Sequence, residues 1–367
     1  MSGGMDSSVA AAFLKRTGFD VIGVFMKFWA PQSNGLHREA EVRARKVAKI
    51  LRIPFYVFNF EKEFKKRIVD YFLAGYKKGI TPNPCILCNK EMKFGLLLRK
   101  ALKLDADFIV TGHYARIIQN DKSKIKNYKL LRAKDKDRDQ SYFLWMLDQK
   151  QLGKILFPIG DYTRKEVENL AKKFRLPVLK AKKSVEICFI KTATNDFLKR
   201  YLKQKPGSII DTERKVIGEH FGLWFYTIGQ RKGIKLFGGP YYVLDKDLKR
   251  NLLIVTKNEK DLFKKELICK NVNWISGKTP KFPLKIKAKI RYRSELTPAI
   301  ITYKFKNLST YKLTFIRPQR AITPGQSVVF YSPAEASTKA GKGHEVLGGG
   351  IIGTGLSPFK KPPSAAF

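Results

Sequence analysis

Short apolar runs alternate with amphipathic segments through the first half of the chain. The apolar runs predict strands at residues 20–26, 54–58 and 107–111, and helical spacing predicts helices at about 37–51, 61–75 and 84–104. This alternation is typical of an α/β domain whose parallel sheet is covered on both faces. Ligands bind such sheets at the carboxyl ends of the strands. We therefore expect one pocket to collect Gly3, Gly4, Met26, Gly112 and His113.

The pattern changes beyond residue 117. Residues 118–138 are polar and charged and predict a hairpin tip, whereas residues 139–147 predict a helix capped by Asp139. Thr163 and Glu166 form a capping box that begins a helix ending near Phe174. After about residue 196, short apolar runs separated by Gly, Asn and Asp predict small barrels or sandwiches.

The length of the chain indicates several domains, because 367 residues exceed what one compact core usually holds. We expect a Rossmann-like α/β catalytic domain at residues 1–195 and a small central domain at 196–278. A C-terminal β-barrel at 279–355 and a flexible tail at 356–367 complete the predicted organisation.

The chain is strongly basic. It has 73 Lys and Arg residues against 31 Asp and Glu residues, for a net charge of +42. This imbalance favours a polyanionic partner, although a lysine-rich proteome would also raise the charge. Neither a long apolar run nor a signal peptide is visible in the sequence. We therefore expect a cytoplasmic protein without a membrane partner.

Residues 2–8 form a glycine-containing loop that leads into an apolar helix. Its backbone N–H groups and the following helix N-terminus favour an anion, and its serines add further donors. Asp6 can hold a magnesium ion that bridges phosphate oxygens. No Lys follows the glycines, so the loop is not a P-loop. Because a phosphate loop normally follows a buried strand, we expect a missing first strand upstream of Met1.

The chain has four cysteines, at positions 85, 88, 188 and 269. Cys85 and Cys88 follow two prolines at a predicted helix start, which favours a lowered thiol pKa. Together with Cys188 they are compatible with a redox disulfide, a persulfide relay or an iron–sulfur cluster. Cys269 is interpreted as structural. His113 is the histidine that we expect in a site, whereas His37 heads a predicted helix and His220 and His344 are predicted in loops.

The chain resembles the tRNA-specific 2-thiouridylase family of PP-loop ATP pyrophosphatases. The stretches that carry the resemblance are residues 2–8, 81–90, 111–116, 139–144, 186–190, 226–233, 291–293, 317–321 and 324–326. They span nearly the whole chain in the order of the family. The resemblance implies ATP-dependent 2-thiolation of the wobble uridine of tRNAs for Lys, Glu and Gln, and a PP-loop domain at residues 1–195.

The resemblance also assigns roles to individual residues. ATP would be bound by Ser2, Gly3, Gly4, Met5, Asp6, Ser7, Ser8, Val9, Met26 and Gly112, with Mg²⁺ held by Asp6 through the nucleotide. The target base would lie against Asn83, Pro84 and Cys85. The tRNA would be contacted by His113, Arg138, Asp139, Gln140, Arg291, Tyr292 and Gln326. Cys88 would be the nucleophile and Cys188 would carry the persulfide.

The implied mechanism adenylates the 2-carbonyl oxygen of uracil and then replaces it with sulfur from Cys188. A sulfur-relay protein or a cysteine desulfurase would supply that sulfur. Cys188 is expected on a mobile segment beside Lys180, Lys182 and Lys183.

Three alternatives to this mechanism remain. Many relatives carry Asp where this chain has Cys85, so an iron–sulfur cluster on Cys85, Cys88 and Cys188 is an alternative to the preferred persulfide route. Another PP-loop adenylating ligase and a non-catalytic RNA-binding protein are further alternatives.

Overall fold

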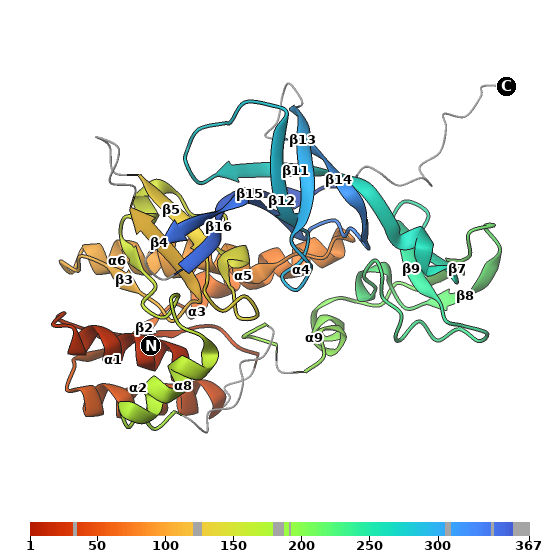
Figure 1. The fold of residues 1–367 in the computed structure, drawn as a ribbon. Helices are drawn as coiled ribbons and strands as arrows, with labels where there is room; N and C mark the ends of the chain where they lie inside the picture. The colour runs from red at the N-terminus through yellow and green to blue at the C-terminus, as the bar shows by residue number, and fades with distance from the viewer. Residues whose placement is uncertain are drawn as a thin grey trace.

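The computed structural model describes residues 1–31, 35–119, 127–178, 187–190, 192–304, 310–338 and 341–354. Figure 1 shows an α/β part with the N-terminus at the lower left, a small β unit at the right and a larger β-barrel at the top. Within the described residues, no helix combines the length and the apolar character needed to cross a membrane. The predicted α/β domain, small central domain and C-terminal barrel are confirmed.

The α/β part contains two short parallel strand pairs. β1 (Gly23–Lys27) pairs with β2 (Phe55–Asn59), and β3 (Ile109–Val110) pairs with β6 (Ile155–Leu156). These elements confirm the three predicted strands. Helix α1 (Met5–Arg16) packs on α8 (Arg164–Lys173) through buried apolar side chains, and α2 (Gly35–Leu51) lies beside β1. The predicted capping box of α8 is present.

The two predicted helices at 61–75 and 84–104 are present, but their middle sections are wound as π-helix. The first run comprises α3 (Glu61–Phe64), η1 (Lys65–Val69) and α4 (Asp70–Lys77). The second comprises α5 (Pro84–Leu87), η2 (Cys88–Leu97) and α6 (Leu98–Leu102). Asn83 caps α5 by accepting the Cys85 N–H, and Pro84 occupies the first turn, where it costs no hydrogen bond. Both runs bury large side chains such as Phe72 and Phe94 in one core.

The strands β4 (Ala115–Gln119) and β5 (Tyr128–Arg132) pair on either side of the hairpin tip predicted at 118–138, of which residues 120–126 lie outside the described residues. β5 pairs with a strand of the barrel, so the hairpin extends the sheet of a distant part of the chain. The predicted helix at 139–147 is wrong, because only a 3₁₀ turn, η3 (Ser141–Phe143), forms there. The carboxylate of Asp139 is buried, pairs with Arg132 and accepts the N–H groups of Ala133 and Ser141. These bonds satisfy the backbone without a helix. Between η3 and α8 lies the short helix α7 (Gln149–Leu152).

The central unit is a four-stranded sheet with the order β8-β7-β10-β9. Its elements are α9 (Thr194–Tyr201), β7 (Gly207–Ile210), β8 (Val216–His220), η4 (Leu223–Phe225), β9 (Tyr242–Asp247), β10 (Leu252–Thr256) and η5 (Glu259–Leu262). His220 ends a strand and is buried, so its prediction as a loop residue is wrong. Its ring Nε2 lies 3.0 Å from the carbonyl oxygen of Asn251.

The barrel has the strand order β11-β14-β13-β12-β15-β16 and is closed by pairing of β11 with β16. The strands are β11 (Phe263–Trp274), β12 (Leu284–Lys289), β13 (Thr297–Lys304), β14 (Tyr311–Arg320), β15 (Ser327–Thr338) and β16 (Gly341–Ile352). The sequence had placed residues 263–274 with the central domain, whereas β11 completes the barrel. His344 is buried within β16, so its prediction as a loop residue is also wrong. Cys269 is fully buried in the barrel core.

Candidate nucleotide and thiol site

The loop before α1 is held by its own hydroxyl groups. Ser2 Oγ lies 3.1 Å from Ser7 Oγ, and the hydroxyls of Ser7 and Ser8 donate to the Gly4 carbonyl at 3.2 Å and 2.9 Å. Gly3 has a φ of +72°, and a Cβ at this position would lie 2.1 Å from the Ala40 carbonyl oxygen. Only glycine fits this position. The loop is thus shaped before any anion arrives, with the N-terminus of α1 at its end.

Gly112, at the carboxyl end of β3, packs directly on this loop. A Cβ on Gly112 would lie 2.4 Å from the Asp6 carbonyl carbon and 2.5 Å from the Ser7 nitrogen. The loop at residues 2–8 therefore contacts the carboxyl end of β3, as the alternation of strands and helices in the sequence predicts. Met5 and Val9 are buried in the core beneath α1, and Met26 on β1 packs against the core that contains Cys88.

Asp6 accepts two hydrogen bonds on the same carboxylate oxygen. The Tyr114 hydroxyl donates to Oδ1 at 3.2 Å, and the Arg164 guanidinium donates to it at 2.9 Å in an ion pair. Burial raises the pKa of Asp6, and Arg164 opposes this shift. Neither bond uses Oδ2, so an oxygen ligand of the kind that Mg²⁺ prefers remains on the carboxylate. The sequence pattern pointed to neither Tyr114 nor Arg164 as part of the site.

Three thiols gather next to the same α/β part. Cys88 begins the π-helix and is buried, Cys85 is half-buried in α5, and Cys188 is exposed. Burial raises the pKa of Cys85, and it raises that of Cys88 to about 12. Protein atoms around the Cys188 sulfur likewise raise its pKa, although the residue as a whole is exposed, and the other two thiols add to this shift. The three sulfurs are therefore close enough to interact electrostatically.

The predicted lowering of the thiol pKa at positions 85 and 88 is wrong. The helix N-terminus that would favour a thiolate belongs to a run that continues into a buried π-helix, and desolvation outweighs the dipole. Lys93 opposes the shift at all three thiols. Lys93 lies five residues after Cys88, which is the hydrogen-bonding interval of a π-helix, so the winding of η2 brings both onto one face. Lys93 is not among the predicted site residues, because the period of an ordinary helix does not pair positions 88 and 93.

His113 lies between Lys93 and the end of β3. Its Nε2 is 3.5 Å from the Lys93 Nζ, and its Nδ1 is 2.7 Å from the Thr111 hydroxyl. The imidazole is buried between the rings of Phe94 and Phe157. Burial, and then Lys93, lower the pKa of His113, which keeps the ring neutral.

The predicted tRNA-contacting residues fall into three environments. Arg138 is exposed, whereas Asp139 is buried in its ion pair with Arg132. Gln140 is joined to Tyr114 by two bonds: its N–H donates to the Tyr114 carbonyl at 2.7 Å, and its Oε1 accepts the Tyr114 N–H at 3.1 Å. Arg138 is thus the member of this run that faces solvent.

Arg291, Tyr292 and Gln326 lie where the parts of the chain meet. The Arg291 guanidinium donates to the carbonyls of Ile228 and Ala321 at 3.3 Å and 2.8 Å. The Gln326 amide donates to the Thr81 carbonyl at 2.9 Å, and the Tyr292 ring lies 4.6 Å from that of Phe143. Gln326 therefore connects the barrel to the segment that leads into Asn83, Pro84 and Cys85.

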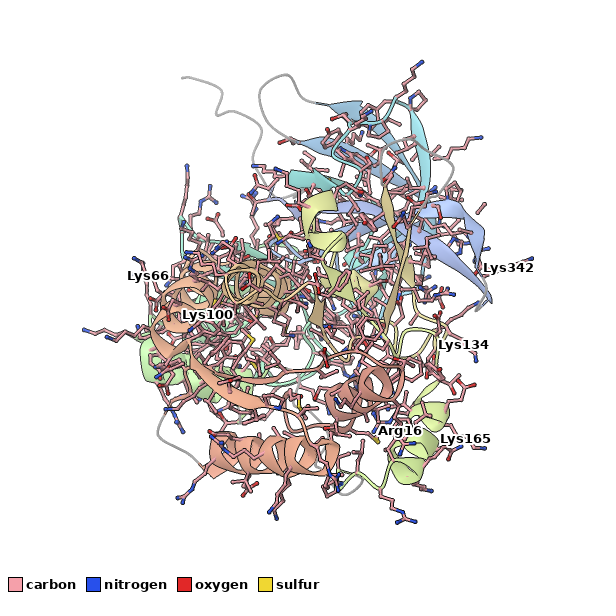
Figure 2. The ribbon with its side chains drawn as sticks, turned by 90° about the vertical axis from the view of Figure 1, so that its left-hand side faces the viewer. Arg16, Lys66, Lys100, Lys134, Lys165 and Lys342 are labelled. Carbon is pink, nitrogen blue, oxygen red and sulfur yellow. The ribbon has the colours of Figure 1, made fainter. Side chains whose placement is uncertain are left out.

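The positive charge covers several faces. Figure 2 shows Lys66 and Lys100 on the left side of the view and Lys134, Lys165 and Lys342 on the right side. The charge is therefore not confined to one patch. Residues 180–183 and the predicted tail lie outside the described residues. Within the described part of the chain, no three His, Cys, Asp or Glu side chains are grouped as ligands for a metal ion.

The fold and the site together define an α/β nucleotide-binding protein with a thiol site, joined to two β domains. Residues 1–192 match the family model of the tRNA methyl transferase HUP domain, and residues 195–257 match that of the tRNA methyl transferase PRC-barrel domain. Residues 264–352 match the aminomethyltransferase beta-barrel domain.

Curated relatives cover nearly the whole chain. The chain is 45% identical to tRNA-specific 2-thiouridylase MnmA 2 of Thermoanaerobacter sp. (strain X514) over 96% of both chains. It is 43% identical to tRNA-specific 2-thiouridylase MnmA of Clostridioides difficile (strain 630), again over 96% of both. The corresponding protein of Coxiella burnetii (strain RSA 493 / Nine Mile phase I) is 44% identical over 96% of both. The chain belongs to the tRNA-specific 2-thiouridylase family.

Proposed function

We propose that this protein is a tRNA-uridine 2-sulfurtransferase that thiolates the wobble uridine of tRNAs for Lys, Glu and Gln. The observation that carries the proposal is the presence, in one α/β part, of both a preformed anion loop and three interacting thiols. Residues 1–195 would form the catalytic domain, and the central unit and the barrel, which includes β11, would bind tRNA. A tRNA substrate and reduced thiols favour the cytoplasm.

The loop residues would hold the phosphates of ATP. The glycines at positions 3 and 112 let the loop pack closely against the neighbouring backbone, which fixes its shape. The N–H groups at the start of α1 favour the charge that develops on the departing pyrophosphate. Mg²⁺ held by Asp6 would neutralise part of that charge. The uracil 2-oxygen attacks the α-phosphate of ATP, and pyrophosphate departs. The oxygen, a poor leaving group by itself, then leaves readily as part of AMP.

Sulfur transfer then uses two cysteines. The Cys88 thiolate attacks the inner sulfur of a persulfide on Cys188, the S–S bond of the persulfide breaks, and hydrosulfide leaves as a Cys88–Cys188 disulfide forms. Hydrosulfide adds to carbon 2 of the activated uracil and AMP departs. An external dithiol must reduce the disulfide, and a sulfur-relay protein or cysteine desulfurase must reload Cys188. The Lys93 ammonium favours the Cys88 thiolate that this step needs.

An iron–sulfur cluster on Cys85, Cys88 and Cys188 is the alternative route to the same product. The lack of a three-ligand group in the described residues gives it no support. The family match and the thiols also speak against another PP-loop ligase and against a non-catalytic RNA-binding protein.

The test is thiolation of unmodified tRNA by protein purified without oxygen, with iron and acid-labile sulfide measured on the same sample. We expect activity without iron, and its loss in Cys88→Ser and in Cys188→Ser while tRNA binding persists. Cys269→Ala, which removes a thiol from the barrel core, is the matched control and should remain active. Activity in either serine variant would refute the relay, and activity that follows iron content would replace it with the cluster route.

A further inference from the structure

Two separate chains of hydrogen bonds join the Asp6 carboxylate to the run Arg138–Gln140. Each chain begins at Asp6, the predicted magnesium ligand of the nucleotide loop. One chain ends at Gln140 and the other at Arg138, which are both predicted tRNA contacts. The residues that connect the ends, Tyr114, Asp135 and Arg164, have no role in the proposed chemistry. Their arrangement calls for a separate explanation.

The first chain runs through Tyr114. Its hydroxyl donates to Asp6 Oδ1 at 3.2 Å, and its backbone exchanges two hydrogen bonds with Gln140 at 2.7 Å and 3.1 Å. The Tyr114 residue is 2% exposed. Paired bonds on a buried residue leave little freedom for Gln140 to move without displacing the hydroxyl from Asp6.

The second chain runs through Asp135 and Arg164. Asp135 accepts the Arg138 N–H on Oδ1 at 3.1 Å and the Arg164 N–H on Oδ2 at 2.8 Å. Arg164 is the first residue of α8, and its side chain reaches Asp6 Oδ1 at 2.9 Å. The Asp135 carboxylate thus holds the loop that presents Arg138. The same carboxylate also holds the backbone of Arg164, whose side chain pairs with Asp6.

Arg164 has two acidic partners. Its Nε donates to Glu168 at 2.8 Å while its Nη1 pairs with Asp6. The Glu168 bond holds the guanidinium beside Asp6, one turn along the same helix. Because both bonds to Asp6 use Oδ1, a metal ion on Oδ2 leaves the two chains closed, and the nucleotide-bound loop stays joined to Arg138 and Gln140.

We propose that tRNA and Mg²⁺–ATP strengthen each other's binding through Tyr114 and Arg164, which act as positioning residues between the two sites. The inference rests on the proposed function. Whichever ligand binds first fixes the shared network, so the second ligand meets a site that is already ordered. The effect on affinity is reciprocal, because the coupling free energy belongs to the pair of ligands.

The experiment measures the affinity of a fluorescent non-hydrolysable ATP analogue in Mg²⁺, with and without saturating unmodified tRNA. In the wild type we expect tRNA to tighten nucleotide binding by about fivefold or more. Tyr114→Phe, which deletes one hydroxyl, and Arg164→Gln should each reduce this factor below about twofold while both ligands still bind. Lys165→Gln is the matched control, because this neighbouring residue on α8 projects outward in Figure 2, and it should keep the wild-type factor.

A second measurement needs no tRNA. Amide hydrogen exchange of residues 135–142 should slow when the analogue and Mg²⁺ bind the wild type. In Tyr114→Phe the slowing at Gln140 should be lost, whereas that at Arg138, which the Arg164 chain reaches, should persist. Equal nucleotide affinity with and without tRNA in the wild type would overturn the inference and leave the proposed function intact. Failure of the wild type to bind tRNA at all would overturn both.

Discussion

The nucleotide loop and the thiol site lie in the same α/β part but are built in opposite ways. Residues 2–8 are held by bonds between neighbours and by glycines with little room around them. The thiols lie in or against an aromatic core that opposes their ionisation, and among the described residues the Lys93 cation acts on all three. The ability of the loop to bind an anion therefore depends on its shape, whereas the ionisation of the thiols depends on the balance between burial and charge.

The largest effect should come from adding a side chain at Gly112, which packs directly against the nucleotide loop. Gly112→Val would place atoms against the backbone of Asp6 and Ser7, which leaves the loop no room to keep its shape. We expect nucleotide affinity to fall by about 100-fold, because each lost hydrogen bond to a charged phosphate costs about 1.5–3 kcal/mol. Equilibrium binding of an ATP analogue measures this loss. The thiol titration should not change, and a changed titration would mean that the two regions are not independent.

An intermediate effect should come from removing the cation at the thiols. Without Lys93, the pKa of Cys88, which burial already raises, should rise further, so less thiolate exists at a given pH. In Lys93→Met we expect alkylation of Cys88 at mildly alkaline pH to slow, because each rise of one in the pKa leaves about tenfold less thiolate. The rate should still rise with pH, because the reactive form is the thiolate.

The control for that experiment is Lys100→Met. Lys100 is on the following helix, α6, and its ammonium lies 4.1 Å from the centroid of the Phe58 ring. Its alkylation profile should match the wild type, and Lys93→Arg should restore most of the rate. A wild-type profile in Lys93→Met would show that burial alone governs the thiols. Nucleotide affinity should be the same in all four proteins.

The smallest effect should come from removing the hydrogen bond between Gln326 of the barrel and the segment that leads to Cys85. Gln326→Ala removes the donor to the Thr81 carbonyl, a loss of about 1 kcal/mol in the free energy of unfolding. Thermal unfolding measures this change. Because Thr81 leads into the Cys85 helix and not into the loop, tRNA thiolation should weaken more than nucleotide binding. Equal weakening of both would remove the distinction between the two regions.

Much of the fold followed from pattern, and the failures have identifiable causes. The strands at 23–27 and 55–59 and the capping box of α8 depend on neighbours in sequence, and they were predicted. The helix at 139–147 failed because Asp139 satisfies backbone N–H groups from a buried ion pair. The pairing of β5 with β16 joins residues about two hundred positions apart, and no local signal carries it.

The candidate site divides in the same way. Loop residues and cysteines were found from motifs, but Tyr114 and Arg164 reach Asp6 across 108 and 158 residues of sequence. A tyrosine beside a histidine and an arginine at a helix start are ordinary in isolation. Lys93 was missed because its relation to Cys88 depends on π-helical winding, which the sequence did not reveal.

The shape of the nucleotide loop could be read from the chain alone, because φ, the absence of a Cβ and hydroxyl bonds over a few residues are local properties. The positions of the cysteines could be read in the same way. How those thiols ionise, and which groups hold Asp6, became visible only in the folded molecule. Desolvation and electrostatic interactions depend on what surrounds a side chain, and those surroundings come from parts of the chain far apart in sequence.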